Sequence, residues 1–164
     1  MSKKRGYITL ELIAYLSIAA VVLLTIGCLL KSITRINNTI LERSELEEIS
    51  IVVEDRIRNE LKESIGIVHM EYTDEPIKGN YKEVSSITYD MYDKDHKKKL
   101  IRNEIVKSGT NLYIVNKGKY QIGNYVQKIF IDFDKNKKMK FLVIYEKGKN
   151  SYKSHFTIYR TNSK

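Results

Sequence analysis

The spacing of apolar and polar positions changes twice along this chain. The first long feature is a run of 19 residues without a charge, from Leu12 to Leu30. After it, apolar residues recur every three or four positions as far as Ile65, which predicts one apolar stripe on a helix. From residue 66 onward, short stretches alternate between apolar and polar side chains, as strands of a half-buried sheet do. The pattern therefore predicts an α+β fold in which a long N-terminal helix packs on an antiparallel sheet.

The uncharged run is long enough to cross a membrane, because about 20 helical residues span the hydrocarbon core. Lys3, Lys4 and Arg5 precede it, and the positive-inside rule places the N-terminus of such a segment in the cytoplasm. We therefore expect a single-pass membrane protein with an extracytoplasmic head. A secretory signal peptide is the weaker alternative, since its small-residue site, Ser17-Ile18-Ala19, lies inside the run and not after it.

The stripe beyond the membrane segment predicts a second helical half with one apolar face. Its residues are Ile33, Ile36, Ile40, Leu46, Ile49, Val53, Ile57, Leu61 and Ile65. Glu54 and Arg58 have the i,i+4 spacing of an ion pair. Gly66 is a natural C-terminal stop. One continuous helix is the main expectation, and two helices with a break between Gly27 and Ser32 are the alternative.

Seven strands are predicted after this helix. They are Ile67–Tyr72, Val84–Tyr92, Lys99–Val106, Asn111–Asn116, Val126–Phe133, Lys140–Glu146 and Tyr152–Arg160. Spacers rich in Asp, Asn, Lys and Gly separate most of them, which favours antiparallel hairpins. The segment from Asp74 to Tyr81 contains the only proline, Pro76, and is predicted to be a loop that joins the helix to the sheet.

One acidic residue, Glu11, stands at the start of the apolar segment. A carboxylate at the centre of a membrane helix costs about 2.5–3.5 kcal/mol and less near the interface, and it usually has a partner. The simplest interpretation is an interfacial glutamate that reaches back to the headgroups or to Lys4 and Arg5.

The local sequence KKRGYITLELIAYLSI resembles the processing signal of type IV prepilins and pseudopilins. In that family a short basic leader ends in Gly, a dedicated aspartic peptidase at the membrane cuts after this Gly, and the new N-terminal residue is methylated. The resemblance implies cleavage between Gly6 and Tyr7 and methylation of Tyr7, which stands where the family usually has Phe. It also places Glu11 at the fifth mature position, after Thr9-Leu10. A carboxylate there implies pairing with the N-terminal amine of a neighbouring subunit, which sets the register of the filament.

The head carries a second, looser resemblance. Its motifs fit the order found in the minor pseudopilins of the J type in type II secretion, in their W-type pilus counterparts and in the F-type competence pseudopilins. The matching residues are Ile87-Thr88-Tyr89, Leu100-Ile101-Arg102, Val126 to Phe130, and Tyr159-Arg160. Together the two resemblances imply a leader over residues 1–6, a filament-core or membrane helix over 7–30, an amphipathic continuation over 31–65 and a sheet head over 66–164.

The function implied by the resemblance is structural. The chain is expected to be a minor pilin or pseudopilin, in a complex at the filament tip that primes assembly, with a prepilin peptidase, a major pilin and other minor pilins as partners. It would reside in the cell membrane first and at the cell surface after assembly. Two alternatives remain at this point, a competence pseudopilin whose basic head binds DNA and a plain single-pass anchor with an unrelated head.

No catalytic, cofactor or metal site is predicted. His69, His96 and His155 lie on different predicted elements, so their spacing indicates no shared site. The segment Asp132-x-Asp134-x-Asn136 opens like a calcium loop. It has Lys137 and Val143 where such a loop needs Gly and Glu. We therefore expect a subunit without enzymatic activity.

Charge is distributed unevenly. Residues 31–65 contain 6 basic and 8 acidic side chains, and residues 66–164 contain 20 basic and 11 acidic ones, so the net charges are −2 and +9. Seven lysines gather at two predicted hairpin ends, namely Lys97, Lys98 and Lys99, and Lys135, Lys137, Lys138 and Lys140. Such a surface attracts DNA or an anionic cell-wall polymer. The alternative is an ordinary solvated face of a half-buried sheet.

Overall fold

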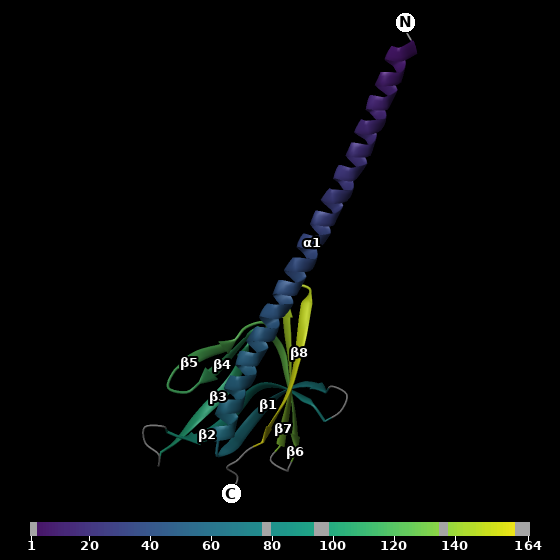
Figure 1. The fold of residues 1–164 in the computed structure, drawn as a ribbon. Helices are drawn as coiled ribbons and strands as arrows, with labels where there is room; N and C mark the ends of the chain where they lie inside the picture. Colours follow the sequence, from purple (N-terminus) through teal and green to yellow (C-terminus); the bar gives the residue numbers. More distant parts are fainter. Residues whose placement is uncertain (1–2, 77–79, 94–98, 135–137, 160–164) are drawn as a thin grey trace. The chain divides into compact units, whose positions relative to one another are not determined.

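The computed structural model describes residues 3–76, 80–93, 99–134 and 138–159. Within them lie one helix, α1 (Lys3–Glu63), and eight strands (Figure 1). The strands are β1 (Gly66–Pro76), β2 (Lys82–Tyr92), β3 (Leu100–Ser108), β4 (Asn111–Val115), β5 (Lys119–Gly123), β6 (Val126–Asp134), β7 (Lys138–Lys147) and β8 (Asn150–Tyr159). The chain divides into two compact units, residues 1–41 and 42–164.

The first unit is the N-terminal part of α1. Its large apolar side chains from Leu10 to Leu41 are all exposed. Among the described residues, α1 is the one helix that is long and apolar enough to cross a membrane. The predicted helix of membrane-spanning length is therefore present. The alternative with a break between Gly27 and Ser32 is wrong, because α1 is uninterrupted there.

The second unit joins the rest of α1 to the sheet. Leu46, Val53, Ile57 and Leu61 are fully buried, and their spacing of seven, four and four places them on one face of the helix. They pack in one cluster with inward-facing strand residues, for example Met139, Phe141, Val143 and Tyr145 of β7. The α+β prediction, a long helix on an antiparallel sheet, is confirmed.

The helix ends two residues earlier than the predicted stripe. The Ser64 hydroxyl donates to the Leu61 carbonyl at 2.7 Å, and the Ile65 amide donates to the Asp90 carbonyl of β2 at 2.8 Å. Main-chain bonding thus passes from helix to sheet at residue 65. Gly66 is the first residue of β1 and not a helix stop, and Ile65 lies outside the helix.

The sheet is antiparallel and branches at β2. Its order is β5-β4-β3-β2-β6-β7-β8, and β1 also pairs with β2. β1 uses one edge of β2 from Lys82 to Asp90. A strand has two edges, so β3 and β6 share the other one. β3 pairs with Ser86–Tyr92, and β6 pairs with Lys82 and Glu83. The two resulting wings curl around the part of α1 that follows Glu42 (Figure 1).

The seven predicted strands are all present, with ends that coincide or are shifted by up to four residues; Arg160 lies outside the described residues. One strand, β5, was not predicted. The predicted loop from Asp74 to Tyr81 is wrong at its start, because β1 continues to Pro76. It is also wrong as a link from helix to sheet, because the segment lies between β1 and β2. The proline is tolerated since it is the last residue of a strand that pairs with β2 alone among the described strands.

Candidate functional site

The predicted processing signal lies in the first turns of α1. The backbone of Lys3, Lys4, Arg5, Gly6 and Tyr7 is helical. Four residues after Tyr7, the exposed Glu11 accepts a hydrogen bond of 3.1 Å from the Tyr15 hydroxyl. Tyr15 was not singled out from the sequence, although its i,i+4 spacing from Glu11 is the signal that indicates such a contact. The carboxylate is thus held against its own helix by one neutral donor and is open to a second one.

The helix that follows Glu11 presents an apolar surface without cover in its own unit. Leu10, Leu16, Leu23, Leu24 and Leu29 are each more than 60 % exposed. This surface can be buried only by lipid or by other protein chains. The arrangement fits a helix that is long and apolar enough to lie in a bilayer.

The two predicted lysine clusters are described only in part. Lys97, Lys98, Lys135 and Lys137 lie outside the described residues. Lys99 precedes β3, and Lys138 and Lys140 lie on β7. Lys99 adjoins the end of β2, because the Asp93 amide donates to its carbonyl. Lys138 and Lys140 pair with the end of β6, which lies beside the start of β2. These described lysines therefore lie at opposite ends of β2.

The lysines of the second cluster that are described have partners on the sheet. Lys140 pairs with Asp132 at 3.1 Å, and the Lys138 ammonium lies 5.6 Å from the centre of the Tyr159 ring. The ion pair neutralises the charge of Lys140 locally. Binding of an anionic polymer by these lysines stays a prediction.

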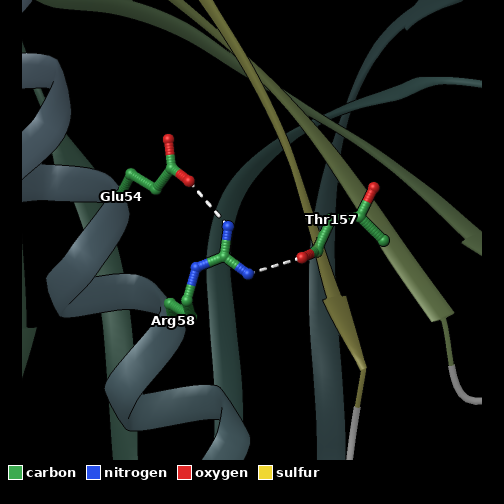
Figure 2. Close-up of polar contacts among 3 residues, drawn as sticks. All are labelled: Glu54, Arg58 and Thr157. Carbon is green, nitrogen blue, oxygen red and sulfur yellow. Dashed lines mark hydrogen bonds and ion pairs between the residues drawn. The ribbon is translucent and has the colours of Figure 1, made fainter.

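At the β8 end of the strand order, a side chain of α1 bonds to the edge strand. Arg58 donates to the Thr157 carbonyl at 2.7 Å and to Glu54 at 2.6 Å (Figure 2), so the predicted i,i+4 ion pair is confirmed. The Arg58 guanidinium also lies 5.8 Å from the centre of the Phe156 ring. One side chain therefore ties the helix to the edge strand by its main chain and by its core aromatic residue.

The same side of the helix binds the turn between β7 and β8. Glu45 pairs with Lys147, and Glu42 accepts a hydrogen bond from the Asn150 amide. The bond to Glu45 raises the pKa of Lys147. Gly148 occupies the left-handed region with φ of 59°, which glycine adopts without strain. The turn is thereby held against the first turns of the second unit.

At the β5 end of the strand order, a groove lies between α1 and β5. We call it the α1–β5 groove. An inner pocket of about 420 Å³ lies between Val52, Arg56 and Glu60 of the helix and the β4–β5 hairpin; the hairpin residues that line it are Ile114, Asn116, Tyr120, Gln121 and Ile122. An adjoining outer pocket of about 370 Å³ is lined by Glu48, Ile49, Val52 and residues 121–124. Val52, Gln121 and Ile122 line both pockets, so the groove is continuous. It was not predicted because β5 was not.

Two tyrosines, Tyr89 of β2 and Tyr145 of β7, are fully buried in the second unit. The Tyr89 hydroxyl donates to Glu60 at 2.8 Å, and burial, with the nearby Glu60 carboxylate, raises the pKa of Tyr89 well above its usual range. Burial also raises the pKa of Tyr145, with a smaller contribution from the charge of Glu54. The Tyr145 hydroxyl has no hydrogen-bond partner among the described residues. These groups stay neutral and serve packing and positioning.

The histidines lie apart in the structure as well. His69 is on β1 and His155 is on β8, and both are exposed, while His96 is outside the described residues. Within the described ranges, no group of three His, Cys, Asp or Glu side chains is placed to hold a metal ion. Comparison of the chain with models of protein families, with curated proteins and with solved structures finds no match.

Proposed function

We propose that this chain is a minor pilin or pseudopilin, a structural subunit of a type IV pilus-like filament that serves a pilus, type II secretion or competence. The observation that carries the proposal is the double use of α1. Its first part combines the Gly6-Tyr7 and Glu11 motif with an exposed apolar surface. Its last part supplies the buried stripe from Leu46 to Leu61 on which the antiparallel sheet packs. A filament subunit needs both, because assembly buries the first part and the head requires the second.

The proposed course of events follows from the charges. The basic residues Lys3, Lys4 and Arg5 hold the N-terminus in the cytoplasm, so the head is extracytoplasmic. A prepilin peptidase removes residues 1–6, and the Tyr7 amine becomes the new N-terminus. Glu11 then binds the amine of a neighbouring major or minor pilin, and an unpaired charge in the apolar filament core is costly enough to fix this register.

The experiment is an intact-mass measurement of the chain expressed with and without a prepilin peptidase. We expect loss of residues 1–6 and one methyl group on Tyr7 only when the peptidase is present. Gly6→Val should stay uncut, and Ser2→Val, which alters the leader away from the cut, should be processed. An intact leader beside a second prepilin that is processed in the same cells would contradict the proposal. It would leave the plain single-pass anchor as the explanation.

A DNA-binding head stays a prediction that the described residues do not strengthen. Of the seven lysines, Lys99, Lys138 and Lys140 are described, and Lys140 is paired with Asp132. Phosphate contacts require several unpaired cations along one path. We therefore propose the structural role.

A further inference from the structure

Two of the three edge strands of the sheet, β8 and β5, are treated differently by α1. At β8, Arg58 occupies the main-chain carbonyl of Thr157. At the opposite end of the strand order, β5 pairs with β4 alone among the described strands. The helix lies close to β5 at Gly123 and leaves the α1–β5 groove beside this contact. An edge strand with unpaired N–H and C=O groups beside an apolar wall is a surface to which an extended peptide can add.

The walls of the groove have one apolar centre. Val52 is 51 % exposed on the helix, and Ile122 faces it from β5 and packs only partly against the core. Side chains on one face of a strand stand about 7 Å apart. A peptide paired with β5 therefore places one apolar side chain between Val52 and Ile122 and its next inward side chain over the inner pocket.

The chemistry of the inner pocket favours a carboxylate at that next position. The side chain of Arg56 has no hydrogen bond or ion pair among the described residues. The Asn116 amide oxygen accepts from Gly118 N–H at 3.2 Å, which leaves its amide nitrogen as a donor. Tyr120 and Gln121 supply further donors. The one acidic residue that lines the pocket, Glu60, accepts the Tyr89 hydroxyl. Its charge opposes that of Arg56, so the preference for a carboxylate rests on Arg56 together with the neutral donors.

The charge of the whole head supports the same partner. Residues 42–164, the unit that contains both walls of the groove, carry a net charge of +5, from 24 basic and 19 acidic side chains. A field of this sign raises the encounter rate with an acidic segment. Glu48 lies at the far end of the outer pocket, where it repels an acidic residue and so fixes which end of the segment carries the carboxylate.

We propose that the α1–β5 groove binds an extended acidic segment of another protein. The backbone of the segment pairs with the free edge of β5, an apolar side chain lies between Val52 and Ile122, and a carboxylate two residues away binds Arg56. Leader processing does not involve the groove, so this inference can fail while the proposed function stands, and the reverse.

The test uses the full chain in lipid nanodiscs and fluorescein-labelled heptapeptides, with fluorescence anisotropy as the readout. The first peptide is Thr-Val-Thr-Val-Thr-Glu-Thr, which places both valines and the glutamate on one face, and matched peptides carry Gln or Lys in place of Glu. We expect the Glu peptide to bind about tenfold more tightly than the Gln peptide, as a charge-assisted hydrogen bond does. The Lys peptide should bind most weakly.

Two controls separate the groove from general charge. Arg56→Gln should remove the preference for Glu over Gln, and Arg43→Gln, an exposed arginine outside the groove on the same helix, should keep it. Alternate backbone N–H groups of an extended peptide point to opposite edges, and only one of these edges can pair with β5. We therefore make two forms of the Glu peptide, each N-methylated on one of the two alternating sets. One form should lose binding, because its methyl groups lie on the edge that pairs with β5. Equal binding of the Glu and Gln peptides, an unchanged preference in Arg56→Gln, or no saturable binding would overturn the proposal.

Discussion

Arg58 of α1 donates a hydrogen bond of 2.7 Å to the main-chain carbonyl of Thr157 in β8. The carbonyl belongs to an edge strand, which pairs with β7 alone among the described strands. The guanidinium therefore supplies a hydrogen bond that a neighbouring strand would otherwise supply. It joins the helix and the end of the sheet without covering the edge with more backbone, and it removes one acceptor from an edge that would otherwise attract other strands.

Arg58→Ala should destabilise the head by about 1–2 kcal/mol, because it loses the bond to Thr157, the pair with Glu54 and the packing on Phe156. The measurement is urea unfolding of the full chain in detergent, followed by tyrosine fluorescence. Arg56→Ala is the matched control. Arg56 lies two positions earlier on the helix and has no hydrogen bond or ion pair among the described residues, so its loss should cost less than about 0.5 kcal/mol. Equal losses in the two variants would show that the Thr157 contact contributes nothing.

The contact between Gly123 of β5 and Val53 of α1 should be sensitive to one added methyl group. A Cβ added to Gly123 would overlap Cγ2 of Val53, so Gly123→Ala should cost about 1–3 kcal/mol through overpacking. Combining it with Val53→Ala should recover part of this loss, because the removed methyl groups make room. A double-mutant cycle in urea measures the coupling.

The control for this cycle is Gly66→Ala. Gly66 has no atom within 4 Å of an added Cβ and no positive φ, so this variant should be close to neutral. Additive losses for Gly123→Ala and Val53→Ala would mean that the strand moves away from the helix at no cost, and the close contact would then not position β5.

The core was predictable from the sequence where the spacing of apolar residues marked a single buried face. The stripe Leu46, Val53, Ile57 and Leu61 has helical spacing and is fully buried, and the alternating residues of β7 are buried in the same way. Each pattern is set by a single buried face. The same spacing at Ile33, Ile36 and Ile40 predicted packing on the sheet, but those side chains are exposed, because spacing alone does not reveal which stretch of a stripe the sheet covers.

The candidate groove was not predictable, because it depends on a strand with little strand character. β5 reads KYQIG, and its first three residues are exposed. It forms because the turn after Asn116 returns the chain to β4, with Ile114 opposite Tyr120. The end of α1 escaped prediction for a similar reason, since the Ile65 amide is taken by Asp90, a residue 25 positions away in sequence. Pairing between distant segments leaves no local signal.

The two buried tyrosines should respond in opposite ways to removal of their hydroxyl groups. Tyr89→Phe loses a bond to Glu60 and should cost about 1 kcal/mol. Tyr145→Phe removes a buried hydroxyl that has no partner among the described residues, so stability should be unchanged or rise by up to about 1 kcal/mol. Urea unfolding of the two single variants decides this, and a similar loss in both would show that the Tyr145 hydroxyl is bonded in solution.

The same tyrosines should make the head sensitive to alkaline pH. The pKa of each is raised in the folded chain, mainly by burial, whereas an unfolded tyrosine titrates near its ordinary pKa of about 10. The folded state therefore keeps the protons that the unfolded state gives up, and stability is full below about pH 10 and falls as the pH rises above it. The double variant Tyr89→Phe with Tyr145→Phe should show a flatter fall between about pH 9 and pH 11, measured by urea unfolding. An identical slope in both proteins would contradict the raised pKa values.

Substitution of Glu11 tests the proposed filament role. Glu11→Gln keeps the size of the side chain and an acceptor for the Tyr15 hydroxyl, but it removes the charge that would bind the amine of a neighbouring subunit. We expect normal membrane insertion and normal removal of residues 1–6, with incorporation into filaments reduced about tenfold or more, as loss of a charge pair in an apolar setting implies. Tyr15→Phe is the matched control, because it removes only the bond within the helix and should leave incorporation near normal. The measurement is the amount of the chain in sheared filaments relative to the membrane fraction. Incorporation of Glu11→Gln at the level of the unaltered chain would exclude a role for this charge in register.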